Sequence, residues 1–251
     1  MNLDRPDLAL FANLVFAWSF ANYFPLGDLD GPERRRVSFA LIRLVALSAA
    51  TWTAVGLSGW PVVAFMVAAA GLLLLSRQRL PKRYRAELEL LNVPILIAVL
   101  FLVRHFGLAT HALVEIGAAP NTIPAALLIM AIVCYALRGG SYVVRGLLEK
   151  GALIPPPAPG PDAKRVQHGR MIGYLERIIV IAAVTAGSYE ALAFLMAAKG
   201  LIRAKELEDR AFAEYFLVGS LASTLVALLA GMSISWIAAT VEKAKWASLF
   251  L

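Results

Sequence analysis

The feature that most constrains this chain is a series of apolar blocks, each about 15 to 25 residues long, separated by short polar loops. Blocks of this length match the hydrocarbon core of a bilayer. Lipid offers the backbone no hydrogen-bond partners, so each block must pair its own N–H and C=O groups as a helix. The composition agrees, because 60% of the residues are hydrophobic and only 16% are charged. We therefore predict an all-α fold, a polytopic α-helical membrane bundle.

Eight such blocks can be distinguished, and we expect seven or eight of them to be transmembrane helices. The first block is the weakest, because Asn13, Ser19 and Asn22 interrupt it. Whether this block crosses the membrane is therefore left open. The eight blocks cover residues 8–25, 37–57, 61–76, 88–107, 121–144, 171–186, 189–202 and 211–240.

Proline and glycine mark the breaks in this pattern. Pro94 removes a backbone N–H within the fourth block and predicts a kink there. We expect Arg138-Gly139-Gly140 to break the fifth block and Gly187-Ser188 to separate the sixth block from the seventh.

The proline-rich segment 154–161 is the strongest boundary in the chain, because such a sequence cannot form the interior of a helix. It divides the chain into three predicted parts. These are N-terminal membrane helices over residues 1–150, a cytoplasmic linker over residues 151–168, and a C-terminal three-helix membrane unit over residues 169–251.

The basic residues predict the orientation of the helices. Seventeen of the 24 Lys and Arg residues fall in the loops after blocks one, three, five and seven, and three fall on the opposite side. Loops rich in Lys and Arg remain in the cytoplasm. This places both termini outside if all eight blocks cross, or the N-terminus inside if only seven do. The net charge of +7 is then explained by loops that face anionic lipid, and we expect no nucleic-acid partner.

Motifs of soluble enzymes are absent from the sequence. It contains no phosphate-binding GxxxxGK[ST] loop, no GxSxG and no HExxH. The histidines, at positions 105, 111 and 168, make no metal-ligand cluster, and Cys134 is the sole cysteine. We expect neither a metal ion nor a cofactor, and the sequence leaves open whether the chain is an enzyme.

Ionisable residues concentrate near the ends of the last three blocks. Blocks six and eight run in one direction and block seven in the other, so residues from all three meet at one shallow inner depth. A charge within a span tends to face a partner or a water-filled cavity. The predicted cluster consists of Glu176, Arg177, Lys199, Arg203 and Glu214, with Tyr215 beside the last of them.

Three interpretations of this cluster are open. The cluster is either a network of ion pairs that locks three helices together, or a site for an anionic headgroup or phosphate, or part of a path for protons or ions. Because the cluster has three cations and only two acids, anion binding is favoured over the passage of protons or ions. Small residues four apart, Gly169 with Gly173 and Gly219 with Ser223, predict close packing of the helices around it. Ser220, Ser223 and Thr224 can also donate hydrogen bonds across the helix interface.

The same residues carry a resemblance to a known family. Residues 169–177 read GRMIGYLER, residues 197–203 read AAKGLIR, and residues 214–223 read EYFLVGSLAS. In this order and spacing they resemble the GxxIGxLER, AAKxxxR and EYFLxGTLxS elements of the bacterial domain-of-unknown-function family 3307. The resemblance covers about residues 138–231 and implies a multi-spanning protein of the bacterial inner membrane. The family name carries no activity.

Together these observations predict an integral membrane protein that binds or processes an anionic lipid or lipid-linked phosphate at the inner leaflet. The alternative is a non-catalytic membrane scaffold or a component of an oligomeric pore or channel. Membrane lipids are the expected partners in either case, with a protein partner or a second copy of the chain as a further possibility.

Overall fold

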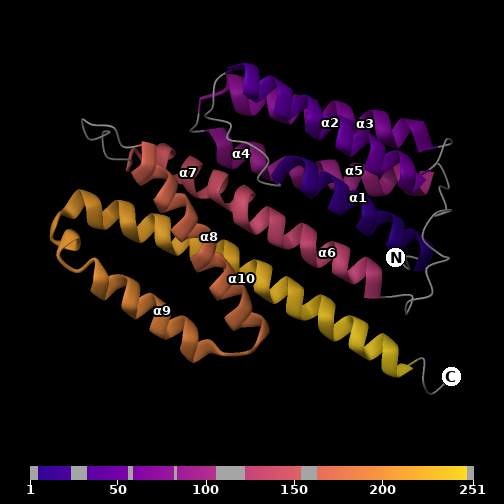
Figure 1. Ribbon diagram of the computed structural model, residues 1–251. Helices are drawn as coiled ribbons and strands as arrows, with labels where there is room; N and C mark the ends of the chain where they lie inside the picture. The colour runs from indigo at the N-terminus through magenta and orange to yellow at the C-terminus, as the bar shows by residue number, and fades with distance from the viewer. Residues whose placement is uncertain are drawn as a thin grey trace. The chain divides into compact units, whose positions relative to one another are not determined.

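The computed structural model describes residues 5–23, 33–55, 59–81, 84–105, 122–153 and 163–247 (Figure 1). Every regular element within these ranges is helical, which confirms the all-α part of the prediction. The elements are α1 (Arg5–Tyr23), α2 (Glu33–Val55), α3 (Trp60–Arg79), α4 (Arg85–Leu90), α5 (Asn92–His105), α6 (Thr122–Cys134), the π-helix η3 (Tyr135–Gly139), α7 (Gly140–Lys150), α8 (Ala163–Thr185), α9 (Tyr189–Ile202), the 3₁₀-helix η4 (Glu206–Glu208) and α10 (Arg210–Ala247).

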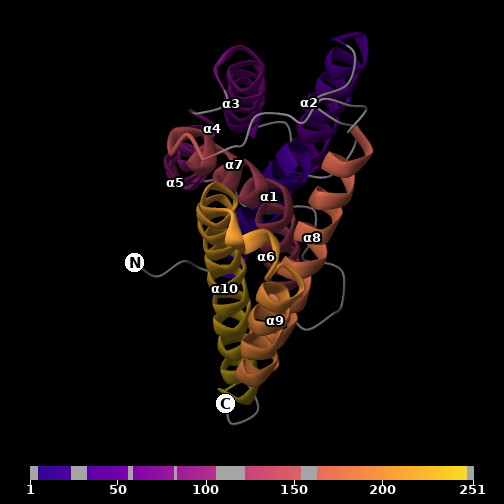
Figure 2. The same ribbon diagram turned by 90° about the vertical axis from the view of Figure 1, so that its left-hand side faces the viewer.

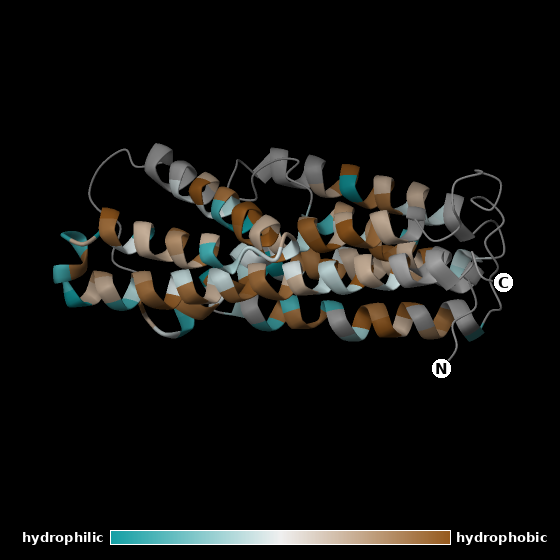
Figure 3. Ribbon diagram, turned by 90° about the horizontal axis from the view of Figure 1, so that it is seen from below, coloured by the Kyte–Doolittle hydropathy of each residue, from teal (hydrophilic) through white to brown (hydrophobic). Residues whose placement is uncertain are grey.

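Three helical stretches among the described residues are long and apolar enough to cross a membrane. They are Trp60–Arg77, Ala125–Lys150 and Arg210–Val241. A shorter apolar stretch, Ala40–Trp52, lies within α2. Figure 3 shows that hydrophobic residues are spread along the length of the helices, with hydrophilic residues concentrated at a few places. The predicted number of seven or eight spans stays a prediction.

The chain divides into two compact units. The first comprises residues 1–80, 90–135 and 237–251. In it α1 packs against α2 and α6, around a core that includes Leu14, Trp18 and Met66. The indole N–H of Trp18 donates to Asn92 Oδ1 at 2.9 Å, and Arg77 Nη2 donates to the Tyr23 hydroxyl at 3.2 Å. Of the polar residues that weaken the first block, Ser19 and Asn22 are buried in this unit.

The second unit comprises residues 81–89 and 136–236. It begins before the predicted boundary at residue 151, because η3 and α7 pack with the C-terminal helices. The proline-rich segment 154–162 lies outside the described residues, and α8 already begins at Ala163, within the predicted linker. Within this unit α8 and α9 follow one another as a hairpin in both views, and α8 crosses α10 in Figure 1 (Figures 1 and 2).

α10 presents its small residues inward and its leucines outward. Ser220, Ser223, Ala227 and Ala230 are buried, whereas the leucines at positions 217, 221, 225 and 229 are 52–58% exposed. A helix of a soluble protein shows the reverse arrangement, with its apolar stripe in the core. Small residues at helix contacts and large apolar residues facing outward are typical of helices surrounded by lipid.

Glycine and proline end helices at two of the predicted places. Gly187, with a φ of 69°, ends α8: its N–H donates to Val184 O and the N–H of Ser188 donates to Ala183 O, which completes a Schellman motif. α4 and α5 are separated at Leu91. Pro94 lacks an N–H, and its ring clashes with the carbonyl four residues earlier, so the helix is interrupted just before this proline.

Candidate functional site

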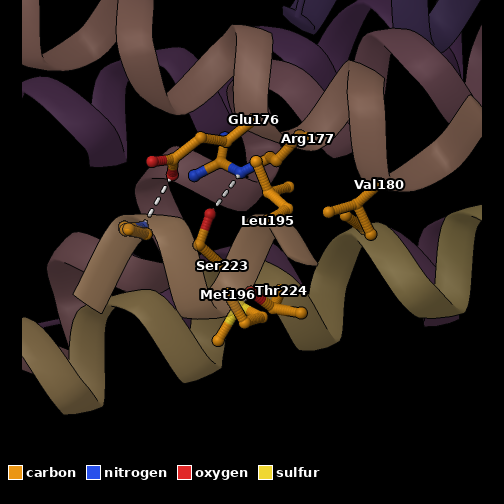
Figure 4. Close-up of a pocket in the computed structure, with 9 residues that line it drawn as sticks. Glu176, Arg177, Val180, Leu195, Met196, Ser223 and Thr224 are labelled. Atoms are coloured by element: carbon orange, nitrogen blue, oxygen red, sulfur yellow. Dashed lines mark hydrogen bonds and ion pairs between the residues drawn. The ribbon is translucent and has the colours of Figure 1, made fainter. Parts of the chain in front are cut away.

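A small recess lies among α8, α9 and α10 of the second unit (Figure 4). Its volume is about 10 Å³, which is room for roughly one water molecule. Polar and apolar side chains line it together. They are Glu176, Arg177, Val180, Leu195, Met196, Lys199, Ser223, Thr224 and Ala227.

The reversal of the chain at Gly187 brings the lining of α8 and α9 together. Glu176 and Lys199 lie almost equally far from this glycine in sequence, on the two helices it joins. In a helical hairpin such residues come to the same level. Lys199 Nζ accordingly lies 2.7 Å from Glu176 Oε2, and both side chains are mostly buried.

Arg177 is the most buried charge of the site, with 4% of its surface exposed. Its Nε donates to Ser223 Oγ at 3.0 Å, and its Nη1 donates to Ser141 Oγ at 2.7 Å and to Ala136 O at 3.3 Å. Nη1 also donates to the carbonyl oxygen of Leu137. All of these partners are neutral. Among the residues that the structure describes, Arg177 forms no ion pair and its Nη2 makes no hydrogen bond.

The carbonyl groups that accept hydrogen bonds from Arg177 belong to the π-helix η3. We predicted a break of the fifth block at Arg138-Gly139-Gly140, but the chain continues there as a helix with one π-helical turn. The glycine is needed for the close approach of α10: a Cβ on Gly140 would lie 2.8 Å from Val226 Cγ1 and 3.6 Å from Arg177 Cζ. π-Helical turns occur frequently at functional sites.

Arg203 follows α9 directly and lies beside Lys199 rather than in the recess. Its guanidinium carbon is 5.7 Å from the ring centroid of Phe216, and Lys199 Nζ is 5.4 Å from the same centroid. Arg203 also lies 5.8 Å from the ring of Phe212. Its closest carboxylate contact is with Glu206 at 3.5 Å, and both of these side chains are exposed.

Glu214 and Tyr215 lie apart from the recess. Glu214 pairs with Arg210 at 3.0 Å near the start of α10, and the Tyr215 ring lies 6.3 Å from that of Phe212. Glu214 precedes Ser223 by nine residues, which corresponds to about 13 Å along a helix. Of the five charged residues for which we inferred a common depth, the structure brings Glu176, Arg177 and Lys199 together at the recess. Lys199 and Arg203 contact the rings of Phe216 and Phe212, on either side of Glu214 in sequence, but the Glu214 carboxylate pairs with Arg210 instead.

The structure adds residues that the charge pattern did not single out as part of the site. We predicted that Ser223 donates a hydrogen bond to a neighbouring helix, and in the structure it accepts one from Arg177. Thr224 contacts Met196, with its hydroxyl 3.6 Å from the sulfur. The serine that follows Gly139-Gly140, Ser141, accepts from Arg177 and donates to Leu137 O at 2.9 Å.

The predicted packing glycines behave differently. A Cβ on Gly219 would meet Leu148 at 3.4 Å, in agreement with close packing there, whereas Gly169 and Gly173 have no described atom within 4 Å of such a Cβ. Among the described residues, no group of three His, Cys, Asp or Glu side chains is placed to hold a metal ion.

Comparison with protein-family models, with curated proteins and with solved structures finds no match to this chain.

Proposed function

We propose that this chain is an integral membrane protein of the bacterial inner membrane, related to domain-of-unknown-function family 3307. In this proposal its second unit binds an anionic lipid or lipid-linked phosphate at the cytoplasmic leaflet. The observation that carries the proposal is the charge of Arg177, which lines the recess without an ion-pair partner among the described residues.

A buried guanidinium is costly when its charge is not balanced. The carbonyl and hydroxyl groups around Arg177 satisfy the hydrogen-bond donors on Nε and Nη1, but they add no negative charge. An anion in the recess supplies that charge and an acceptor for Nη2. Hydrogen bonds between a guanidinium and a phosphate are charge-assisted and therefore stronger than neutral ones.

The lining of the recess follows the polarity of a lipid. On α8 the charged pair Glu176 and Arg177 is followed one turn later by Val180, and on α10 Ser223 and Thr224 are followed by Ala227. α9 runs the opposite way, so Lys199 accompanies the charged end while Leu195 and Met196 accompany the apolar end. One end of the recess thus suits a headgroup and the other an acyl chain.

The recess, at about 10 Å³, is smaller than a phosphate group in this structure. We propose that it widens when the ion pair between Glu176 and Lys199 separates. Lys199 is the one lining cation that has a carboxylate partner, at 2.7 Å. An incoming phosphate takes the place of that carboxylate on Lys199. The Glu176→Gln variant, which lacks the competing charge, should therefore bind dodecyl phosphate more tightly than the native protein. If the pair only locks α8 to α9, this variant loses stability and gains no affinity.

Analysis of co-purified lipid tests the central observation. We expect the native protein in mild detergent to retain anionic lipid that mass spectrometry detects, and the Arg177→Gln variant to lose it. Arg210→Gln is the matched control, because it removes a cation of the same unit whose side chain is 93% exposed. Equal anionic-lipid content in all three proteins would contradict the proposal.

A non-catalytic scaffold or a component of an oligomeric pore is the second candidate function. The observation that favours it is the open face of α8 at Gly169 and Gly173, where no described atom lies within 4 Å of an added Cβ. Small residues four apart let a second helix approach closely. The Gly173→Leu variant should then dissociate an oligomer of the native protein in size-exclusion chromatography with light scattering. A native protein that is monomeric in lipid discs excludes this candidate.

A further inference from the structure

We propose that Lys199 and Arg203 form a second anion subsite next to the recess, so that the site takes a lipid with two linked phosphate groups, a diphosphate. This inference rests on the proposed function. The first phosphate lies between Arg177 and Lys199, and the second lies between Lys199 and Arg203.

The two cations of this subsite share one aromatic platform. Phe212 and Phe216 are nearly parallel, with ring centroids 6.2 Å apart and an angle of 18° between the planes. Lys199 lies over Phe216, and Arg203 lies over both rings. Attraction to the ring faces holds the cations in place without occupying their N–H donors. Apart from the contacts of Lys199 with Glu176 and of Arg203 with Glu206, the donors therefore stay available for phosphate oxygens.

The positive charge of Arg203 is only weakly neutralised by its carboxylate partner, Glu206. Its contact with Glu206 is 3.5 Å long, and the exposed fractions of the two side chains are 40% and 59%. Exposed ion pairs of this kind contribute little, because water screens them. A phosphate displaces the Glu206 carboxylate readily, and the guanidinium can hold it through two parallel hydrogen bonds.

Lys199 joins the two subsites, because it lines the recess and also contacts Phe216. Arg203 is four residues further along the chain, which corresponds to roughly 6 Å of helix rise. Arg177, Lys199 and Arg203 thus form a series from the buried end of the site to its exposed end. A diphosphate matches this series better than a single phosphate, which leaves Arg203 unused.

A pair of ligands that differ by one phosphate tests this inference. Binding of dodecyl phosphate and dodecyl diphosphate is measured on the full chain in phosphatidylcholine discs. We expect the diphosphate to bind about tenfold more tightly or better, as one added charge-assisted contact predicts. The Arg203→Gln variant should lose this preference, because it weakens binding of the diphosphate more than binding of the monophosphate. The Arg203→Lys variant keeps the positive charge but cannot form two parallel hydrogen bonds to one phosphate, so it should retain only part of the preference for the diphosphate.

The control variant is Arg210→Gln, which removes a neighbouring exposed cation and should keep the full preference for the diphosphate. Equal binding of the two ligands by the native protein overturns the second subsite. So does an equal effect of Arg203→Gln and Arg210→Gln, which would point to general charge attraction. The proposed function fails separately, if the native protein does not bind the monophosphate or if Arg177→Gln leaves that binding unchanged.

Discussion

The Nη1 amino group of Arg177 on α8 donates a hydrogen bond to the carbonyl oxygen of Leu137, inside the π-helix η3. The Nε of the same side chain donates to Ser223 Oγ on α10 at 3.0 Å. One guanidinium therefore connects α8 with η3 and with α10. Its hydrogen bonds hold the charged end of the recess in place, and its remaining Nη2 group makes no hydrogen bond to any residue that the structure describes.

Removal of the Arg177 guanidinium should lower the stability of the protein. Arg177→Met leaves Ala136 O and Ser223 Oγ without their donor, and we expect a loss of about 1–3 kcal/mol for orphaned buried polar groups. Unfolding in mixed micelles of increasing denaturing detergent measures the loss. The exposed Arg210→Met variant is the control and should change stability by less than about 0.5 kcal/mol. Equal stability of the two variants would show that the guanidinium contributes nothing to packing.

The sequence predicted the part of this site that follows from helix direction. Opposite directions and a glycine turn are enough to bring Glu176 and Lys199 together. Helix direction did not predict the partner of Glu214, whose carboxylate pairs with Arg210 one turn earlier on the same helix. The π-helix η3 was not predictable from periodicity, since Arg138-Gly139-Gly140 reads as a break. Formation of η3 depends on the contact of Gly140 with α10 and on the hydrogen bonds that the η3 carbonyl groups accept from Arg177. Both are tertiary interactions.

Close packing at Gly231 should make alanine unfavourable there. An added Cβ would lie 2.7 Å from Val184 Cβ and 3.4 Å from the carbonyl oxygen of Ile181, so α8 and α10 must move apart. We expect Gly231→Ala to lower the free energy of unfolding by about 1–3 kcal/mol. Gly71→Ala is the matched control in α3, because no atom of the described residues lies within 4 Å of an added Cβ there. It should raise stability by up to about 1 kcal/mol through helix propensity. Destabilisation by both changes would indicate a general intolerance of alanine rather than contact at Gly231.

The ion pair between Glu87 and Lys150 should make stability depend on pH. Lys150 Nζ lies 2.7 Å from Glu87 Oε1, and this hydrogen bond lowers the pKa of the Glu87 carboxyl from its ordinary value of 4.5. A carboxyl with a lowered pKa stabilises the folded protein above the unfolded-state pKa, and loses that effect as the pH falls through the folded-state value. The native protein should therefore exceed Glu87→Gln in melting temperature at pH 7, and the difference should vanish in acid. High salt should reduce it as well, because both side chains are exposed. A difference that grows as the pH falls would contradict the assigned direction.

Cysteine labelling should place the two ends of the α8–α9 hairpin on opposite sides of the membrane. Cys134 is the only cysteine, so Cys134→Ser provides a background for single cysteines. The loop after α9 belongs to the basic set of loops, and such loops remain in the cytoplasm. We expect Lys205→Cys to react with an impermeant maleimide only after the cells are permeabilised. Tyr189→Cys, next to the turn at Gly187, should react in intact cells.

Lys150→Cys is the control for the cytoplasmic side, because α7 ends in another basic segment. Labelling of Lys205→Cys in intact cells would reverse the orientation and place the recess at the outer leaflet, and protection of both hairpin positions would show that this hairpin does not cross.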